Sequence, residues 1–102
     1  MQNFKNLIGG EWVEAGDGAT FLNENPANHE DVIGAFASAT KEDTRAAIEA
    51  ARAALPAWAN MPPPSRGAIL DKASRILEAR QHEYAAILTR EEGKTRSEAL
   101  GE

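Results

Sequence analysis

The sequence predicts a mixed α/β segment, in which a short β-hairpin and strand region is followed by two to three amphipathic helices. Two observations carry this prediction. Adjacent glycines near the start separate two short strand-like runs, which is typical of a tight hairpin. After Thr40, apolar residues recur every three or four positions, which is the period of a helix face. We therefore expect strands in residues 1–39 and helices in residues 40–102.

The strand region divides at glycine and proline. Residues 6–8 and 11–13 flank Gly9-Gly10, and glycines supply the positive φ angles that a two-residue hairpin turn requires. Residues 20–24 form a further candidate strand, which ends at Asn25-Pro26 because proline cannot donate a ladder hydrogen bond. Residues 31–38 are predicted to form the last strand.

The first helix is predicted to begin at Thr40. Asp43, three residues later, completes a pattern that resembles a capping box, with aspartate in place of glutamate. The apolar face of this helix includes Ile48, Ala51, Leu55 and Trp58. Pro56 is expected to tighten or end the helix, because it lacks the N–H that a helix interior uses.

A second helical stretch follows three consecutive prolines. Its apolar stripe starts at Ile69 and continues past Arg80 to Leu88. Gly93 fits the position just after a helix C-terminus, and a further short helix is predicted to begin at residues 95–97.

The composition excludes several classes of protein. The chain has 102 residues, 20 of them alanine, so few large side chains are left to build a core. It has no cysteine, which rules out a disulfide framework and a cysteine nucleophile within these residues. A net charge of −5 disfavours nucleic acid and anionic membranes as partners. No apolar run is long enough to span a bilayer, and we expect a cytoplasmic protein.

Two glycine motifs imitate nucleotide-binding loops. Gly16 and Gly18 are followed by Phe21, where a dinucleotide fingerprint requires a third glycine, and no helix follows directly. Gly93-Lys94-Thr95 resembles the end of a phosphate-binding loop, but Leu88 stands where the first glycine belongs. We interpret the second motif as a helix cap.

The remaining polar residues form no catalytic pattern. His29 and His82 are far apart in the sequence and have no second histidine or cysteine nearby, so zinc ligation is not indicated. The residues themselves therefore indicate no catalytic and no cofactor-binding side chain.

Several motifs in order nevertheless resemble the start of the NAD(P)-dependent aldehyde dehydrogenase superfamily. They are residues 6–13, 25–27, 46–58, 65–70, 91–94 and 98–102. The resemblance implies an α/β parent fold with a Rossmann-type nucleotide-binding domain, to whose helical part residues 40–102 would belong. Residues 25–34 also resemble the branch that acts on α-ketoglutaric semialdehyde (2,5-dioxovalerate).

The resemblance implies oxidation of an aldehyde to the acid through a cysteine thiohemiacetal, with hydride transfer to NAD or NADP. The catalytic and nucleotide-binding residues of the family lie beyond residue 102. The chain would therefore be an N-terminal fragment, inactive and without cofactor on its own. Its implied partners are the remainder of the dehydrogenase chain and, through exposed apolar helix faces, further copies of itself.

The resemblance also implies a monovalent cation site. Some family members bind such an ion through backbone oxygens that correspond to Asn23 and Glu24 and a carboxylate that corresponds to Glu102, and oxygen donors suit it. The alternative for Glu102 is an ordinary acid on a helix surface. The alternative for the whole chain is a free-standing small α+β binding or assembly module without catalysis.

Overall fold

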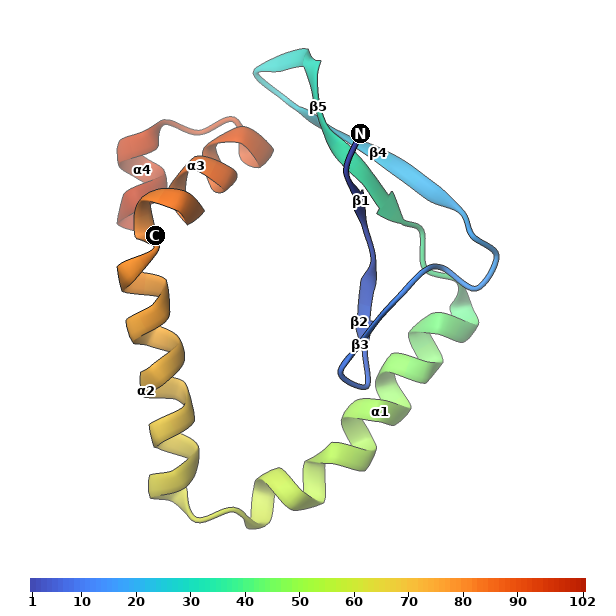
Figure 1. Ribbon diagram of the computed structural model, residues 1–102, viewed down its shortest axis with the longest axis vertical. Coiled ribbons are helices and arrows are strands. Elements are labelled where there is room, and N and C mark those ends of the chain that lie inside the picture. Colours follow the sequence, from blue (N-terminus) through green and yellow to red (C-terminus); the bar gives the residue numbers. More distant parts are fainter. The chain divides into compact units, whose positions relative to one another are not determined.

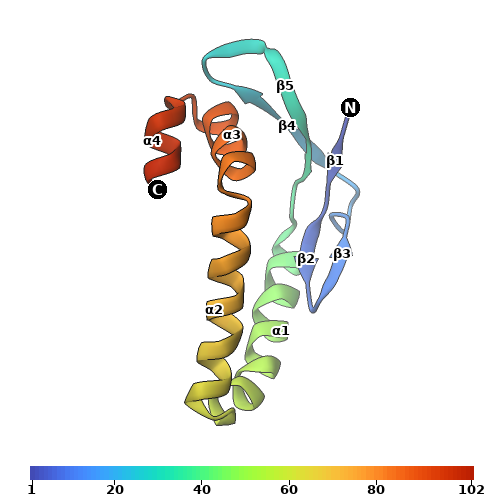
Figure 2. The same ribbon diagram turned by 60° about the vertical axis from the view of Figure 1, so that its left-hand side comes forward.

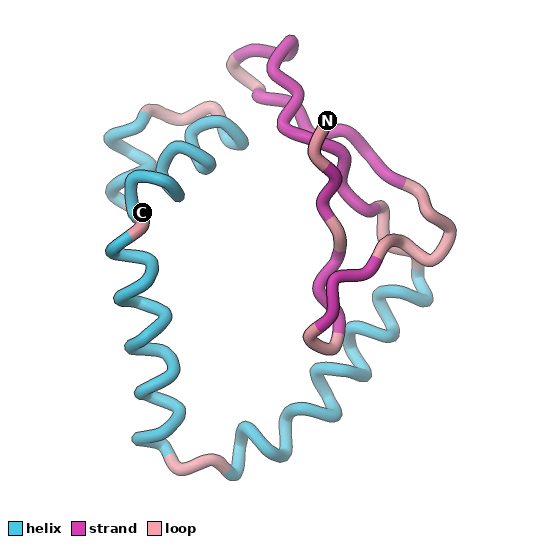
Figure 3. Tube along the Cα trace, viewed as in Figure 1, coloured by secondary structure: helices cyan, strands magenta, loops and turns pink.

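The computed structural model describes residues 1–102 and contains five strands and four helices. Strands occupy the first part of the chain and helices the rest (Figures 1 and 3). The chain forms two compact units, one of residues 1–23 and 32–60, the other of residues 24–31 and 61–102. The predicted order of a strand region followed by helices is confirmed.

The first unit contains the predicted hairpin. Strand β2 (Asn6–Ile8) pairs antiparallel with β3 (Glu11–Val13), and Leu7 faces Trp12 across the ladder. Gly9 and Gly10 have φ angles of 61° and 83°, which the two-residue turn requires. Figures 1 and 2 both show this hairpin beside helix α1, with which β2 makes contact.

The strands before and after the hairpin form a three-stranded sheet, with strand order β1-β5-β4. β4 (Thr20–Asn25) and β5 (Asn28–Ala37) were expected, and the turn between them contains Pro26. β1 (Asn3–Phe4) was not, because two residues carry no periodicity. It pairs in parallel with β5, so that Phe4 lies opposite Phe36.

Aromatic packing fixes this parallel pair. The rings of Phe4 and Phe36 stack with their centroids 4.4 Å apart, and Phe21 lies 5.8 Å from Phe36. A Cβ atom on Gly34 would approach the Phe4 ring to 2.6 Å and the carbonyl oxygen of Gln2 to 2.7 Å. Glycine is therefore required for β1 to lie this close to β5.

Helix α1 (Lys41–Asn60) starts at the predicted capping box. Thr40 Oγ1 accepts the N–H of Asp43 at 3.1 Å, and the Asp43 carboxylate accepts the N–H of Thr40 at 2.8 Å. Pro56 was expected to tighten or end the helix, and it does not end it, since α1 continues through it to Asn60. Proline removes one backbone hydrogen bond, and the helix tolerates that loss near its C-terminus.

The second unit contains the other three helices: α2 (Pro63–Ala79), α3 (Gln81–Glu92) and α4 (Arg96–Gly101). The predicted second helix is thus two helices, divided at Arg80, whose φ of −109° and ψ of 17° depart from helical values. The guanidinium of Arg80 donates hydrogen bonds to Glu83 and lies over the ring of Tyr84. The Arg80 side chain therefore stabilises the first turn of α3. Gly93 ends α3 with φ 79°, as expected, and Thr95 begins α4 with a capping box to Glu98.

The core consists of small side chains only. The buried apolar residues are Ala15, Ala35, Ala85 and Ala99. Large apolar side chains lie mostly outside, and Trp12, Leu55 and Leu70 are each at least 60% exposed. None of the helices combines the length and apolar character needed to cross a membrane.

Candidate functional site

Two of the predicted cation ligands follow one another in strand β4. Asn23 is half-buried and Glu24 is exposed. The carboxylate of Glu24 lies 3.5 Å from Nδ1 of His29, on the other side of the β4–β5 turn. The side chain of Glu24 thus has an intramolecular partner.

The third predicted ligand, Glu102, directly follows α4. Its carboxylate pairs with the ammonium of Lys94, which also lies 3.3 Å from Glu92. Lys94 is only 16% exposed. The hydrogen bond to Glu102, assisted by Glu92, raises the pKa of Lys94. A cation supplied by the chain itself therefore neutralises the predicted ligand.

No group of three or more His, Cys, Asp or Glu side chains is arranged to hold a metal ion. The ligands expected at residues 23 and 24 are backbone oxygens. The absence of a cluster of side chains therefore does not test them. The monovalent cation site at Asn23, Glu24 and Glu102 stays a prediction.

A groove of 420 Å³ lies between the helices of the second unit. It forms where α3 contacts α4 closely, at Ala85 and Ala99, which are 3% and 6% exposed. Leu77, Leu88 and Leu100 contribute apolar walls. The other lining residues are Ser74, Glu78, Gln81, Tyr84 and Glu102. This lining suits an apolar side chain and offers no histidine or cysteine for nucleophilic chemistry.

The charged residues of the second unit also include a long-range ion pair. Two guanidinium nitrogens of Arg90, on α3, donate to both carboxylate oxygens of Asp31, on β5, with the shortest N–O distance 2.6 Å. These bonds and a further one from Asn25 lower the pKa of Asp31 from 3.8 to about 2. The same pair raises the pKa of Arg90.

The sequence pattern predicted neither this ion pair nor the groove. Asp31 and Arg90 are 59 positions apart, and each lies in an element whose pattern looks ordinary. The only signal in the sequence is one charged residue on each of the two elements. Such a residue does not show which partner it will have.

The comparisons with known proteins agree from end to end of the chain. The aldehyde dehydrogenase family model matches residues 12–102. An alpha-ketoglutarate semialdehyde dehydrogenase of Haloferax volcanii is 46% identical over 98 residues, covering 96% of this chain and 20% of the relative. An alpha-ketoglutaric semialdehyde dehydrogenase of Bacillus subtilis is 42% identical over 102 residues, covering 100% and 21%.

The fold agrees as well. The crystal structure of an NAD-dependent aldehyde dehydrogenase from Sinorhizobium meliloti superposes with a TM-score of 0.91 at 32% identity. That alignment covers 98% of this chain and 20% of the other. The fold is thus that of the N-terminal part of α/β aldehyde dehydrogenases. The chain belongs to the aldehyde dehydrogenase family and matches its N-terminal segment, which confirms the predicted resemblance and parent fold.

The chain spans about a fifth of the length of the curated relatives it matches. The family uses NAD or NADP, and the solved relative is described as NAD-dependent.

Proposed function

We propose that this chain is the N-terminal part of an NAD(P)-dependent dehydrogenase that oxidises a semialdehyde, of the α-ketoglutaric type, to the carboxylic acid. The observation that carries the proposal is the 46% and 42% identity, over almost the whole chain, to two relatives named for that substrate. Reaction through a cysteine thiohemiacetal would take place on residues outside these 102, because the chain has no cysteine.

The segment's own contribution is structural in this proposal. Its large apolar side chains are exposed while its buried side chains are alanines, so its helix faces need further protein to cover them. This pattern supports the remainder of the dehydrogenase chain as the partner. It counts against a free-standing module, which would need a core of its own.

Alone, the chain is proposed to be inactive, to bind neither NAD nor NADP, and to self-associate through the exposed helix faces. We also propose a cytoplasmic location, as expected from the sequence. The cation site at Asn23, Glu24 and Glu102 is part of the proposal for the whole enzyme.

The proposal is tested with a chimera. Residues 1–102 replace the matching segment of the Bacillus subtilis relative, and NAD(P)H formation from α-ketoglutaric semialdehyde is followed at 340 nm. We expect turnover by the chimera and none by residues 1–102 alone. The matched control is the relative with its own segment deleted, which should be inactive.

A chimera that is soluble and folded but does not oxidise the semialdehyde would refute the proposal. Turnover by residues 1–102 alone would refute the claim that they are inactive. For the cation site, the melting temperature of the active chimera is measured in potassium and in tetramethylammonium at equal ionic strength. Glu102→Gln should abolish any potassium-specific increase.

A further inference from the structure

A bidentate ion pair between Arg90 and Asp31 connects the end of α3 to the segment that follows the β4–β5 turn. Nε of Arg90 lies 3.1 and 3.0 Å from the two carboxylate oxygens of Asp31, and the terminal nitrogen lies 2.6 Å from Oδ1. Because the guanidinium and the carboxylate are both planar, this arrangement fixes the angle between the two elements as well as their distance.

The same carboxylate is also tied to the start of the turn. Nδ2 of Asn25 donates to Asp31 at 3.2 Å, while Oδ1 of Asn25 accepts the N–H of Ala27 at 2.9 Å. Asn25, the last residue of β4, thus joins Ala27 in the turn to Asp31 in β5. Any movement of Asp31 away from Arg90 therefore acts on the conformation of the turn.

A packing contact lies three residues beyond Arg90, at Gly93. A Cβ atom on Gly93 would lie 3.0 Å from Cγ of Pro26 and 3.7 Å from the N atom of Ala27. The turn therefore rests directly against the residue at which α3 ends. Arg90 is in the last turn of α3 and Gly93 directly follows the helix, so the ion pair and this contact lie at the same end of α3.

We propose that Asp31, Arg90, Asn25 and the Pro26–Gly93 contact form a clasp, which makes the β4–β5 turn and the α3–α4 junction open and close together. The side chains of Arg90 and Asp31 are 45% and 31% exposed. A single exposed ion pair of this kind contributes little by itself. Here the bidentate geometry and the packing at Gly93 act on the same two segments, which are remote in the sequence.

Hydrogen exchange on the full 102-residue chain tests the clasp. The reporters are the amides of Ala27 and Glu30, which donate to Asn25 and Asn28 in the turn, and of Gly93, which donates to Thr89. Asp31→Asn and Arg90→Gln should each accelerate exchange at all three amides by a similar factor, about fivefold. The double variant should exchange no faster than either single variant, because each removes the same interaction.

The matched control is the pair Arg80 and Glu83, which is also bidentate, at 2.9 and 2.6 Å, and half exposed. Both residues of this pair lie at the start of α3 and connect no other element. Arg80→Gln and Glu83→Gln should therefore leave the exchange rates of the three reporter amides unchanged. Acceleration at Ala27 and Glu30 with Gly93 at its original rate would overturn the clasp, and so would unchanged rates at all three.

A variant with the two charges swapped tests the ion pair even if a single variant does not fold. Asp31→Arg combined with Arg90→Asp should restore exchange at all three amides toward the original rates. If the combined variant keeps its helical circular dichroism but exchanges as fast as the single variants, the ion pair does not couple the two segments.

Discussion

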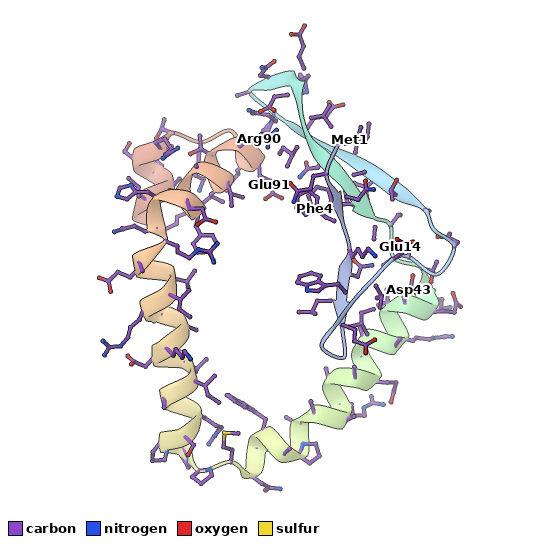
Figure 4. The ribbon with its side chains drawn as sticks, in the orientation of Figure 1. Met1, Phe4, Glu14, Asp43, Arg90 and Glu91 are labelled. Carbon is purple, nitrogen blue, oxygen red and sulfur yellow. The ribbon has the colours of Figure 1, made fainter.

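The carboxylate of Asp43 accepts the backbone N–H of Gly16 at 2.9 Å, although 27 residues separate them. The same oxygen accepts the N–H of Thr40 at 2.8 Å and so also caps α1 (Asp43 is labelled in Figure 4). The pKa of Asp43 is lowered, mainly by the bond from Gly16 and then by those from Thr40. One side chain thus fixes both the helix start and the loop before β4.

Replacing Asp43 should therefore loosen two places at once. In Asp43→Ala, amide exchange should accelerate at Gly16 and at Thr40, because both N–H groups lose their acceptor. Asp43→Asn keeps one acceptor oxygen without the charge, so we expect a smaller acceleration. Asp71→Asn, in an exposed i,i+4 pair with Arg75, is the control and should affect neither amide. Acceleration at Thr40 alone would mean that the loop is held by other contacts.

The ion pair of Asp31 should be visible in its titration. The folded-state pKa of about 2 lies below the ordinary value of 3.8, so the charged form stabilises the fold. This stabilisation is complete above pH 3.8 and is lost as the pH falls through about 2. Carboxyl-carbon NMR should give a midpoint near 2, raised strongly by Arg90→Gln and less by Asn25→Ala. A midpoint that Arg90→Gln leaves in place would contradict the assignment.

Gly93 should not tolerate a side chain. Its φ of 79° is unfavourable for alanine, and the added Cβ would meet Pro26 at 3.0 Å. We expect Gly93→Ala to destabilise the chain by ~1–2 kcal/mol in urea unfolding followed by circular dichroism. Gly67, inside α2 with nothing within 4 Å of its Cβ position, is the matched control. Gly67→Ala should stabilise by ~0.5–1 kcal/mol, since glycine is unfavourable in a helix interior.

Self-association should depend on one face of α2. Leu70 and Leu77 are 63% and 57% exposed and lie seven residues apart, on the same side of the helix. Sedimentation velocity should show a sedimentation coefficient that rises with concentration, and Leu70→Lys should weaken this rise. Ala68→Lys adds the same charge about 200° away around the helix and should have less effect. A compact monomer at every concentration would refute self-association.

The strand region was predictable where glycine or proline residues mark a turn or the end of a strand. Gly9-Gly10 identified the hairpin, and Asn25-Pro26 the end of β4, because these residues restrict the backbone by themselves. β1 could not be predicted, since its two residues become a strand only through pairing with β5. Pro56 does not end α1, because the helix around it is long enough to tolerate one missing hydrogen bond.

The candidate site was less predictable than the fold. Gly93 was recognised as a helix cap because its backbone conformation is a local property. Its contact with Pro26 and the pairing of Asp31 with Arg90 are long-range, and no spacing rule connects them. The pairing of Lys94 with Glu102 was likewise missed, because the two residues lie on opposite sides of the short helix α4 in the sequence.

The four buried apolar residues are alanines, and large apolar residues already face outward, so we expect unusual thermal unfolding. Unfolding exposes little new apolar surface, so the heat-capacity increment should fall below the ~12–15 cal/mol/K per residue of ordinary globular domains. The dependence of stability on temperature is then only weakly curved. Calorimetry of residues 1–102 should accordingly give a broad, shallow transition with nearly level baselines on either side.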